Sequence, residues 1–303
     1  MPDTTEPEAV PFDDDLIESW AIALHAERKA RRTRETYTRN LRLYAAWCRE
    51  HGQPVALSRH SLRSYLAGLD DAGLSDNTVA SRHIAIRLFC TWLAEEEGTA
   101  DVLYGIKGPK IDEKVVDPFT DEELAALLAA CRGLGFADRR DEALVRVFIE
   151  AGPRAADILS MTVSGTNVAA GTAVLVGKGG GERVIAFGPQ ARRAIDRYLR
   201  MRRMHRLAGV SDRLWLGDRG KTFGYNGLYR TLAVRAQAAG IEGFHLHRLR
   251  HTFADRWLDK GGSEGGLMTV AGWQSRKMVD RYARRRQAVR AVSESHRLEL
   301  GDL

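Results

Sequence analysis

The sequence predicts a mainly α-helical protein of two domains with one small β-hairpin. Three observations support this fold class. Apolar residues recur at helical spacing through most of the chain, one glycine-dense turn separates two runs of β-branched residues, and a stretch rich in Gly, Pro and charge divides the pattern in two. At 303 residues the chain is also longer than a single hydrophobic core usually requires, so two domains are the default expectation.

The first predicted domain is helical and covers residues 14–108, after an acidic tail over residues 1–13. In TRETYTRNLRLYAAWC the apolar residues from Tyr37 to Trp47 fall on one helical face, and HGQPVALSRHSLRSYLAGL predicts a shorter helix after a Gly/Pro break. Several arginines lie off the apolar faces near helix starts, where phosphate is favoured, although a solvated basic face is the commoner explanation. These candidate phosphate contacts are Arg31, Arg32, Arg34, Arg82 and Arg87.

A second long helix is predicted in LSDNTVASRHIAIRLFCTWL. Ser75 or Asp76 can cap its start. Its apolar side is expected to hold Ile84, Leu88 and Trp92, which recur four residues apart.

The second predicted domain covers residues 117–303, after a linker over residues 109–116 that is rich in Gly, Pro and charge. It begins with a capping box of Thr120 and Glu123. GTAVLVGKGGGERVIAFG predicts the β-hairpin. Helices are then expected in PQARRAIDRYLRMRRMHRL, NGLYRTLAVRAQAAG, HRLRHTFADRWLDKG and SRKMVDRYARRRQAVRAV.

Charge and composition narrow the class of protein. The net charge is +6, although the first eighteen residues hold seven carboxylates and no cation, so the body of the chain is basic. A basic body suits a polyanion such as nucleic acid, while an ordinary protein of high isoelectric point would show the same total. The sequence shows no membrane-length apolar run and no signal-peptide pattern, so we expect a soluble intracellular protein. The scattered Cys48, Cys90 and Cys131 are expected to be buried, reduced thiols.

Two histidines and two arginines are concentrated in the stretch HRLRHTF. On a helix, His247 and Arg250 would share one face, whereas His251 lies off that pair and is expected to be structural. A tyrosine in the later stretch DRYARRR, Tyr282, follows nine residues after the tryptophan of AGW, Trp273.

Three further residues, and Tyr282 itself, have ordinary structural explanations when each is taken alone. Arg154 could cap a helix, Lys178 could be a solvated turn residue, Trp273 could belong to a core, and Tyr282 could extend its hydroxyl to solvent beside arginines. Their common order is the informative feature. An arginine, a hairpin lysine, His-x-x-Arg, a tryptophan after Gly and a tyrosine nine residues later resemble the tyrosine recombinase (phage integrase) family along nearly the whole chain.

The resemblance implies a fold and a set of site residues. Residues 14–108 are similar to the family's helical, SAM-like core-binding domain, and residues 117–303 to its α+β catalytic domain. Asp157 resembles the acidic residue that steadies the first arginine. The implied catalytic residues are Arg154, Lys178, His247, Arg250, Trp273 and Tyr282.

The implied reaction is transesterification of DNA. Tyr282 would attack a phosphodiester, form a 3′-phosphotyrosine and release a 5′-hydroxyl, a scheme that requires neither a cofactor nor a metal. His247 is the candidate base, and Lys178 is the candidate acid for the leaving oxygen. Arg154 and Arg250 would neutralise the transition state. Trp273 stands where most of the family has histidine and can donate a hydrogen bond but accept no proton.

The resemblance also implies partners. We expect a double-stranded DNA site, and a protein that is a homotetramer on that DNA and a monomer or dimer when free. An accessory DNA-bending protein is an optional partner, and the expected location is cytoplasmic and nucleoid-associated, in a bacterial or phage-infected cell. The short N-terminal tail favours a compact two-domain integrase or a Xer-type resolvase. A type IB topoisomerase-like strand transferase and a non-catalytic DNA-binding protein are the alternatives. The segment after Tyr282 could pack on its own domain or dock on a neighbouring protomer.

Overall fold

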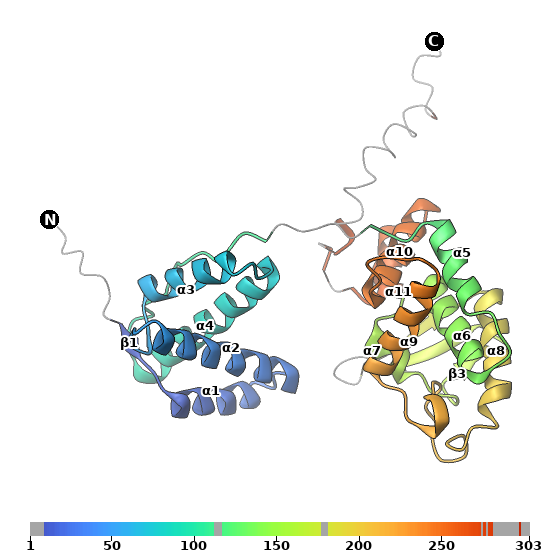
Figure 1. Cartoon of the computed structure of the whole chain (residues 1–303), viewed down its shortest axis with the longest axis horizontal. Coiled ribbons are helices and arrows are strands. Elements are labelled where there is room, and N and C mark those ends of the chain that lie inside the picture. The colour runs from blue at the N-terminus through green and yellow to red at the C-terminus, as the bar shows by residue number, and fades with distance from the viewer. Residues whose placement is uncertain are drawn as a thin grey trace, which may run out of the picture. The chain divides into compact units, whose positions relative to one another are not determined.

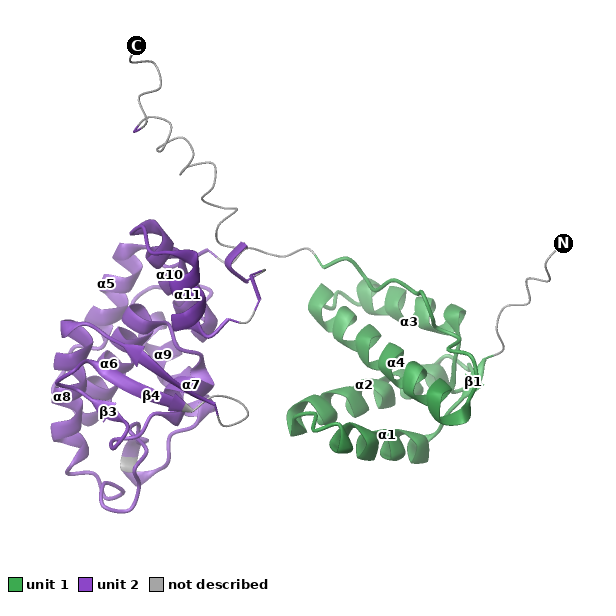
Figure 2. Cartoon of the chain, turned by 180° about the vertical axis from the view of Figure 1, so that it is seen from behind, with its two compact units in different colours: residues 1–114 green, residues 115–303 purple. Residues whose placement is uncertain are grey.

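The computed structural model divides the chain into two compact units, residues 1–114 and 115–303, which Figure 2 distinguishes by colour. Among the residues it describes, no helix combines the length and the apolar character needed to cross a lipid bilayer. Figure 1 labels the elements of both units. The described residues are 9–111, 117–176, 181–273, 275–276, 278–280 and 297.

The first unit packs its helices around an aromatic core. Trp20, Tyr44 and Phe89 are buried in it, and the Trp20 and Phe89 ring centroids lie 5.4 Å apart. In this geometry aromatic edges contact aromatic faces. The elements are β1 (Val10–Pro11), α1 (Asp14–Ala26), α2 (Arg31–Glu50), β2 (Ala56–Leu57), α3 (Arg59–Asp71) and α4 (Asp76–Glu97).

The end of the predicted acidic tail is part of this unit. Val10 and Pro11 form a short antiparallel pair with β2, and the side chain of Phe12 is buried against Phe89. Asp13 then caps α1, because its carboxylate accepts the backbone N–H of Leu16 at 2.9 Å. These residues belong to the unit because the large apolar side chain of Phe12 is buried and anchors its neighbours in the chain.

The predicted apolar side of α4 is wrong. Ser75 is the N-cap residue, as expected, but Ile84 and Leu88 are 45% and 43% exposed. The buried side instead carries Ile86 and Phe89. The helix is apolar on more than one face, so spacing alone allowed two choices, and the aromatic core selected the one that contains Phe89.

The second unit places helices around a small antiparallel sheet of order β3-β4-β5. The predicted hairpin is confirmed as β4 and β5, and β3 extends it by one short strand. The predicted capping box is also present, with Thr120 and Glu123 each accepting the other's backbone N–H. The elements are α5 (Asp121–Ala130), α6 (Phe136–Ala151), α7 (Ala155–Ser160), β3 (Thr166–Asn167), β4 (Thr172–Val176), β5 (Glu182–Ala186), α8 (Pro189–Arg202), the 3-10 turn η1 (Asp218–Gly220), α9 (Tyr225–Ala238), α10 (Leu246–Asp259) and α11 (Glu264–Ala271).

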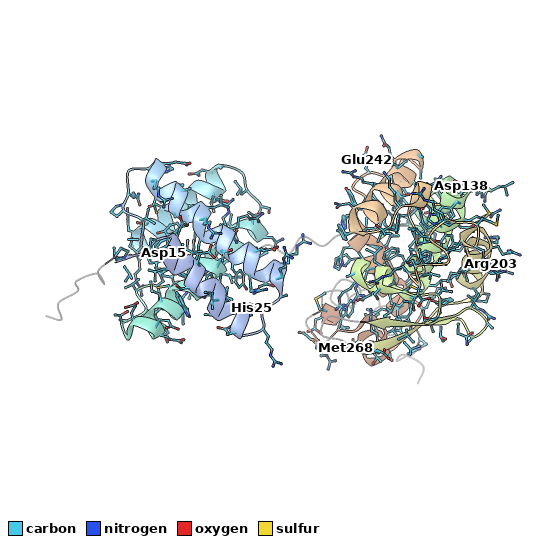
Figure 3. All side chains as sticks on the ribbon, turned by 90° about the horizontal axis from the view of Figure 1, so that it is seen from below. Asp15, His25, Asp138, Arg203, Glu242 and Met268 are labelled. Atoms are coloured by element: carbon cyan, nitrogen blue, oxygen red, sulfur yellow. The ribbon has the colours of Figure 1, made fainter. Side chains whose placement is uncertain are left out.

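Packed apolar side chains fill the interior of this unit, whose side chains Figure 3 draws in the body that carries the labelled Asp138 and Arg203. Cys48, Cys90 and Cys131 are free and buried, as predicted, and burial raises the pKa of the Cys131 thiol to about 12. A thiol with such a pKa is not a thiolate at neutral pH.

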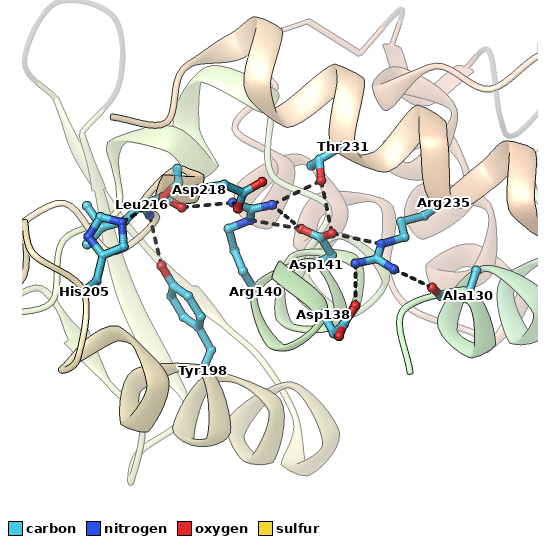
Figure 4. A network of polar contacts seen from close by, with 11 residues as sticks. Ala130, Asp138, Arg140, Asp141, Tyr198, His205, Leu216, Asp218, Thr231 and Arg235 are labelled. Carbon is cyan, nitrogen blue, oxygen red and sulfur yellow. Dashed lines mark hydrogen bonds and ion pairs between the residues drawn. The ribbon is translucent and has the colours of Figure 1, made fainter. Parts of the chain in front are cut away.

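A charged network crosses the core of the second unit (Figure 4). Arg140 and Asp141 are each only 1% exposed and are paired at 2.9 Å. Arg140 also donates to Asp218 at 2.7 Å, and Arg235 donates to Asp138 and Asp141 at 2.7 and 3.0 Å. We call this set the α6 charge network. Its members are Asp138, Arg140, Asp141, Asp218, Thr231 and Arg235.

Candidate active site

Arg154 stands at a sharp turn between α6 and α7. Gly152 ends α6 in the left-handed region, with φ of 54°, and a Cβ at that position would lie 2.2 Å from the Phe253 ring. Glycine is therefore required both by the backbone and by the close approach of α10. Arg154 follows as the N-cap residue of α7, and its side chain is 48% exposed.

Asp157 holds this turn from the first turn of α7. Its buried carboxylate accepts the backbone N–H of Arg154 at 3.2 Å and lies 3.9 Å from the Arg154 guanidinium. The same oxygen accepts a shorter bond from the guanidinium of Arg183, on β5. Asp157 thus contacts Arg154 as the resemblance implied, but its tighter ion pair is with an arginine that the sequence did not single out.

Arg250 is buried in the middle of the second unit, 2% exposed. Two of its N–H groups donate to backbone carbonyls, one to Gly152 at 2.7 Å and one to Ala271 at 2.6 Å. Both carbonyls lie at helix C-termini, which carry partial negative charge and favour a cation. The guanidinium carbon also lies 5.3 Å from the centroid of the buried Trp273 ring, a cation–π distance.

The end of α11 organises three arginines from three different elements. Arg183 donates to the carbonyl of Val270 at 2.8 Å, and Arg154 donates to that of Gly272 at 2.9 Å. With the bond from Arg250 to Ala271, three successive carbonyls each accept a guanidinium. We call Val270, Ala271 and Gly272 the α11 carbonyl triad. Because a carbonyl is neutral, it orients a guanidinium without cancelling its charge.

His247 lies in the first turn of α10, three residues before Arg250, and is exposed. Its ring meets the ring of His251 edge-on, with centroids 4.5 Å apart. His251 is buried, as a structural residue would be, but it lies directly against His247 rather than apart from it. The helix start is fixed by His245, whose Nδ1 accepts the backbone N–H of Arg248 at 3.0 Å.

The structure therefore brings together Arg154, Arg250 and Trp273 around the end of α11, with His247 on the helix that supplies Arg250. Lys178 and Tyr282 lie outside the described residues, as does most of the chain after Tyr282. Sequence reasoning missed Arg183. Its one signal is its place on the strand that follows the glycine turn after Lys178.

Three of the five predicted phosphate contacts of the first unit also have partners within the protein. Arg31 pairs with Glu35 at 2.7 Å on the surface of α2. Arg82 donates to the Tyr65 hydroxyl at 2.8 Å, and Arg87 lies 3.4 Å from Asp101. Arg32 is exposed and Arg34 half-buried in the first turns of α2.

The charge and geometry of the second unit define a site for an anion. No cluster of three or more His, Cys, Asp or Glu residues suited to a metal ion occurs in the part of the chain that the structure describes. Partly exposed Arg154 and buried Arg250 instead supply planar donors, which match the oxygens of a phosphate diester.

Comparisons with known proteins point to one family for both units. Residues 118–288 match the phage integrase family, and residues 17–97 match the phage integrase N-terminal SAM-like domain. Tyrosine recombinase XerD of Bifidobacterium longum is 30% identical, over 86% of this chain and 89% of the relative. Tyrosine recombinase XerC of Pseudomonas fluorescens is 26% identical, over 88% of this chain and 90% of the relative.

Solved structures share the fold. The Tn1549 transposon integrase in complex with transposon right end DNA matches with a TM-score of 0.71 at 14% identity, covering 91% of this chain and 99% of that one. The XerH site-specific recombinase bound to a palindromic difH substrate matches with a TM-score of 0.65 at 19% identity, covering 77% and 72%. The chain belongs to the phage integrase family. It is a site-specific tyrosine recombinase with a SAM-like domain and a recombinase catalytic domain.

Proposed function

We propose that this chain cleaves and rejoins the strands of double-stranded DNA through a 3′-phosphotyrosine on Tyr282. The observation that carries the proposal is the convergence of Arg154 and Arg250 on the end of α11, beside Trp273. Two guanidiniums at one place suit a phosphorane, whose extra negative charge develops on non-bridging oxygens. The XerH and Tn1549 integrase relatives are themselves seen in complexes with DNA, which supports DNA as the partner.

The two arginines have different roles because they differ in exposure. Arg250 is buried and bonded to two helix ends, so it provides a fixed positive charge behind the phosphate. Arg154 is partly exposed and anchored through one N–H group to Gly272, so its other N–H groups remain available as donors to a phosphate. The buried Trp273 indole packs against the Arg250 guanidinium.

The reaction needs a base for the Tyr282 hydroxyl and an acid for the leaving 5′-oxygen. A tyrosine hydroxyl has a pKa of about 10, so Tyr282 needs a base, and exposed His247 on α10 is the proposed one. Lys178, in the glycine-rich stretch of sequence between β4 and β5, would donate a proton to the 5′-oxygen that leaves. Each step exchanges one phosphate ester for another, so the energy of the cleaved bond is kept for religation.

The wider organisation is proposed on the same basis. Residues 14–108 would bind the recombination site as a core-binding domain, with the five arginines of α2 and α4 as candidate contacts, residues 109–116 would link the domains, and residues 117–303 would catalyse. A homotetramer on two duplexes would exchange strands. If the C-terminal segment couples protomers, truncation after Arg286 would reduce recombination more than half-site binding.

The test is a covalent trap. Tyr282→Phe protein, which can bind but not cleave, selects a preferred site from randomised duplexes, and nicks are then placed along that site so that the cleaved fragment diffuses away. Wild-type protein should form a DNA adduct that survives denaturing electrophoresis, and Tyr282→Phe should form none. An adduct that persists in Tyr282→Phe, or no wild-type adduct on any nicked duplex, would contradict the proposal.

A type IB topoisomerase shares the same covalent chemistry, so a second assay separates the two. Plasmids that carry two selected sites should yield recombinant products. Relaxation of a plasmid with a single site, without any recombinant from two, would favour the topoisomerase. The chain's match to recombinases along both domains favours recombination.

A further inference from the structure

Arg183 occupies a central place among the site residues. From β5 it reaches the carboxylate of Asp157 on α7 and the carbonyl of Val270 at the end of α11. Its side chain is 20% exposed, and its partner carboxylate is buried. One side chain therefore joins the strand that follows the Lys178 turn, the helix that begins at Arg154, and the helix that precedes Trp273.

The charges around Asp157 explain why two arginines are needed there. Asp157 is within 4.0 Å of both the Arg154 and the Arg183 guanidinium, so two cations share one anion. The shorter contact belongs to Arg183, while the Arg154 guanidinium stays 3.9 Å away. Without Arg183, the buried carboxylate would have Arg154 as its nearest cation, and attraction in a poorly hydrated setting would draw that guanidinium inward.

Gly272 keeps the two arginines close together. It ends α11 with φ of 62°, and a Cβ there would lie 2.7 Å from Nη1 of Arg183 and 3.5 Å from Nη1 of Arg154. The backbone thus leaves room for both guanidiniums to pass beside the α11 carbonyl triad.

We propose that Arg183 is a positioning residue that balances the charge of Asp157, so that the Arg154 guanidinium remains directed at a DNA phosphate. The inference rests on the proposed function and extends it to a residue that contacts no reacting atom. Loss of Arg183 should therefore slow DNA cleavage, because Arg154 would then neutralise the phosphate less well. The loss of rate should be larger for a charged phosphate than for an uncharged one.

That dependence gives a test that a purely structural role would not pass. Nicked duplexes of the selected site are prepared with either a normal phosphate or a methylphosphonate at the scissile position, and the rate of adduct formation is measured in single turnover with the full-length chain. A methylphosphonate lacks one negative charge, so it needs less neutralisation by Arg154. Arg183→Met should slow the phosphate reaction about tenfold or more and the methylphosphonate reaction about twofold at most.

Three further variants make the result specific. Arg183→Lys keeps a positive charge and should recover most of the phosphate rate. Asp157→Asn combined with Arg183→Met removes the unbalanced carboxylate and should recover part of it. Arg197→Met is the matched control, because Arg197 also pairs with a largely buried carboxylate, that of Glu142 at 2.7 Å, but on α8. It should leave both rates unchanged.

The outcomes separate this inference from the proposed function. If the wild-type chain forms no adduct, the proposed function is wrong and the inference falls with it. If the wild type reacts and Arg183→Met reacts equally fast, or is slowed equally on both substrates, only the role of Arg183 is wrong. If Arg183→Met shows no cooperative thermal unfolding, Arg183→Gln, which also removes the charge, takes its place, and a defect of equal size on both substrates would overturn the inference.

Discussion

The α6 charge network and the candidate active site both collect arginines inside the same unit, but they treat the charge differently. In the network, Arg140 and Arg235 face three carboxylates, so the positive charge is matched within the protein (Figure 4). In the site, Arg154 and Arg183 share Asp157, and neutral carbonyls complete their anchoring.

This difference separates stability from function. A buried ion pair whose members are fully bonded contributes to the fold, so removing one member lowers the free energy of unfolding. A guanidinium held by a carbonyl is oriented but keeps its charge, and a substrate anion can then use it. Variants in the two regions should therefore change different measurements.

The largest effect on stability is expected from Arg140→Met. It leaves Asp141, which is 1% exposed, without its closest partner at 2.9 Å. The free energy of unfolding should fall by about 3 kcal/mol, the lower end of the usual cost of breaking a buried pair on one side, because Arg235 still pairs with Asp141 at 3.0 Å. Chemical denaturation measures it. Arg139→Met, which removes a looser contact with Glu142 at 3.8 Å, is the control and should cost under about 1 kcal/mol.

Arg154→Ala should show the opposite profile. Its side chain is 48% exposed, so the free energy of unfolding should change by about 1 kcal/mol or less. The single-turnover rate of adduct formation should fall about a hundredfold or more, equivalent to roughly 3 kcal/mol of transition-state stabilisation. A variant that loses stability but keeps its rate would place Arg154 with the network rather than with the site.

Gly272→Ala should lower the rate by about tenfold, because its Cβ would displace Arg183 at 2.7 Å from the α11 carbonyl triad. Gly261→Ala is a matched control. Gly261 has φ of 80°, also in the left-handed region, but nothing lies within 4 Å of its Cβ position. Both variants should lose about 1 kcal/mol of stability from backbone strain, and only Gly272→Ala should lose rate. Equal rates in the two would show that the packing beside Gly272 is unimportant.

The smallest expected effect is a pH dependence at the start of α10. Burial and the charge of Arg248 lower the pKa of His245, whose neutral Nδ1 caps the helix. The unfolded chain therefore binds a proton more readily than the folded one. The contribution of the cap, on the order of 1 kcal/mol, should be present above about pH 6.5 and be lost as the pH falls below that value.

His245→Asn tests this assignment by thermal unfolding across pH. Asparagine also caps helices but does not titrate, so the variant should lose the part of the pH dependence that comes from this position. A pH profile identical to that of the wild type would assign the dependence to other groups.

Many elements of the fold and several site residues could be predicted from the sequence, because they depend on residues that are close together in the chain. Helix caps such as Thr120, the glycine-rich hairpin and the order of Arg154, His247, Arg250 and Trp273 are all legible in short stretches. The structure brings Arg154, Arg250 and Trp273 into one site, while the catalytic roles of all six residues stay predictions.

What could not be predicted depends on long-range contacts. Arg183 is 26 residues from Asp157 and 87 from Val270. Every residue has a backbone carbonyl, so a sequence pattern cannot show which carbonyl accepts a hydrogen bond. The orientation of α4 was likewise decided by Phe89 meeting Phe12, 77 residues earlier in the chain, rather than by spacing along the helix. Such contacts decide which of several locally equivalent choices is made.

The most direct test of the central claim is the preference of Arg154→Ala for methylphosphonate over phosphate at the scissile position. If the site holds positive charge for a DNA phosphate, the wild type should react faster with phosphate, and Arg154→Ala should reverse that preference. A preference that is the same in Arg154→Ala and in the wild type would show that Arg154 does not neutralise the phosphate, and it would contradict the account.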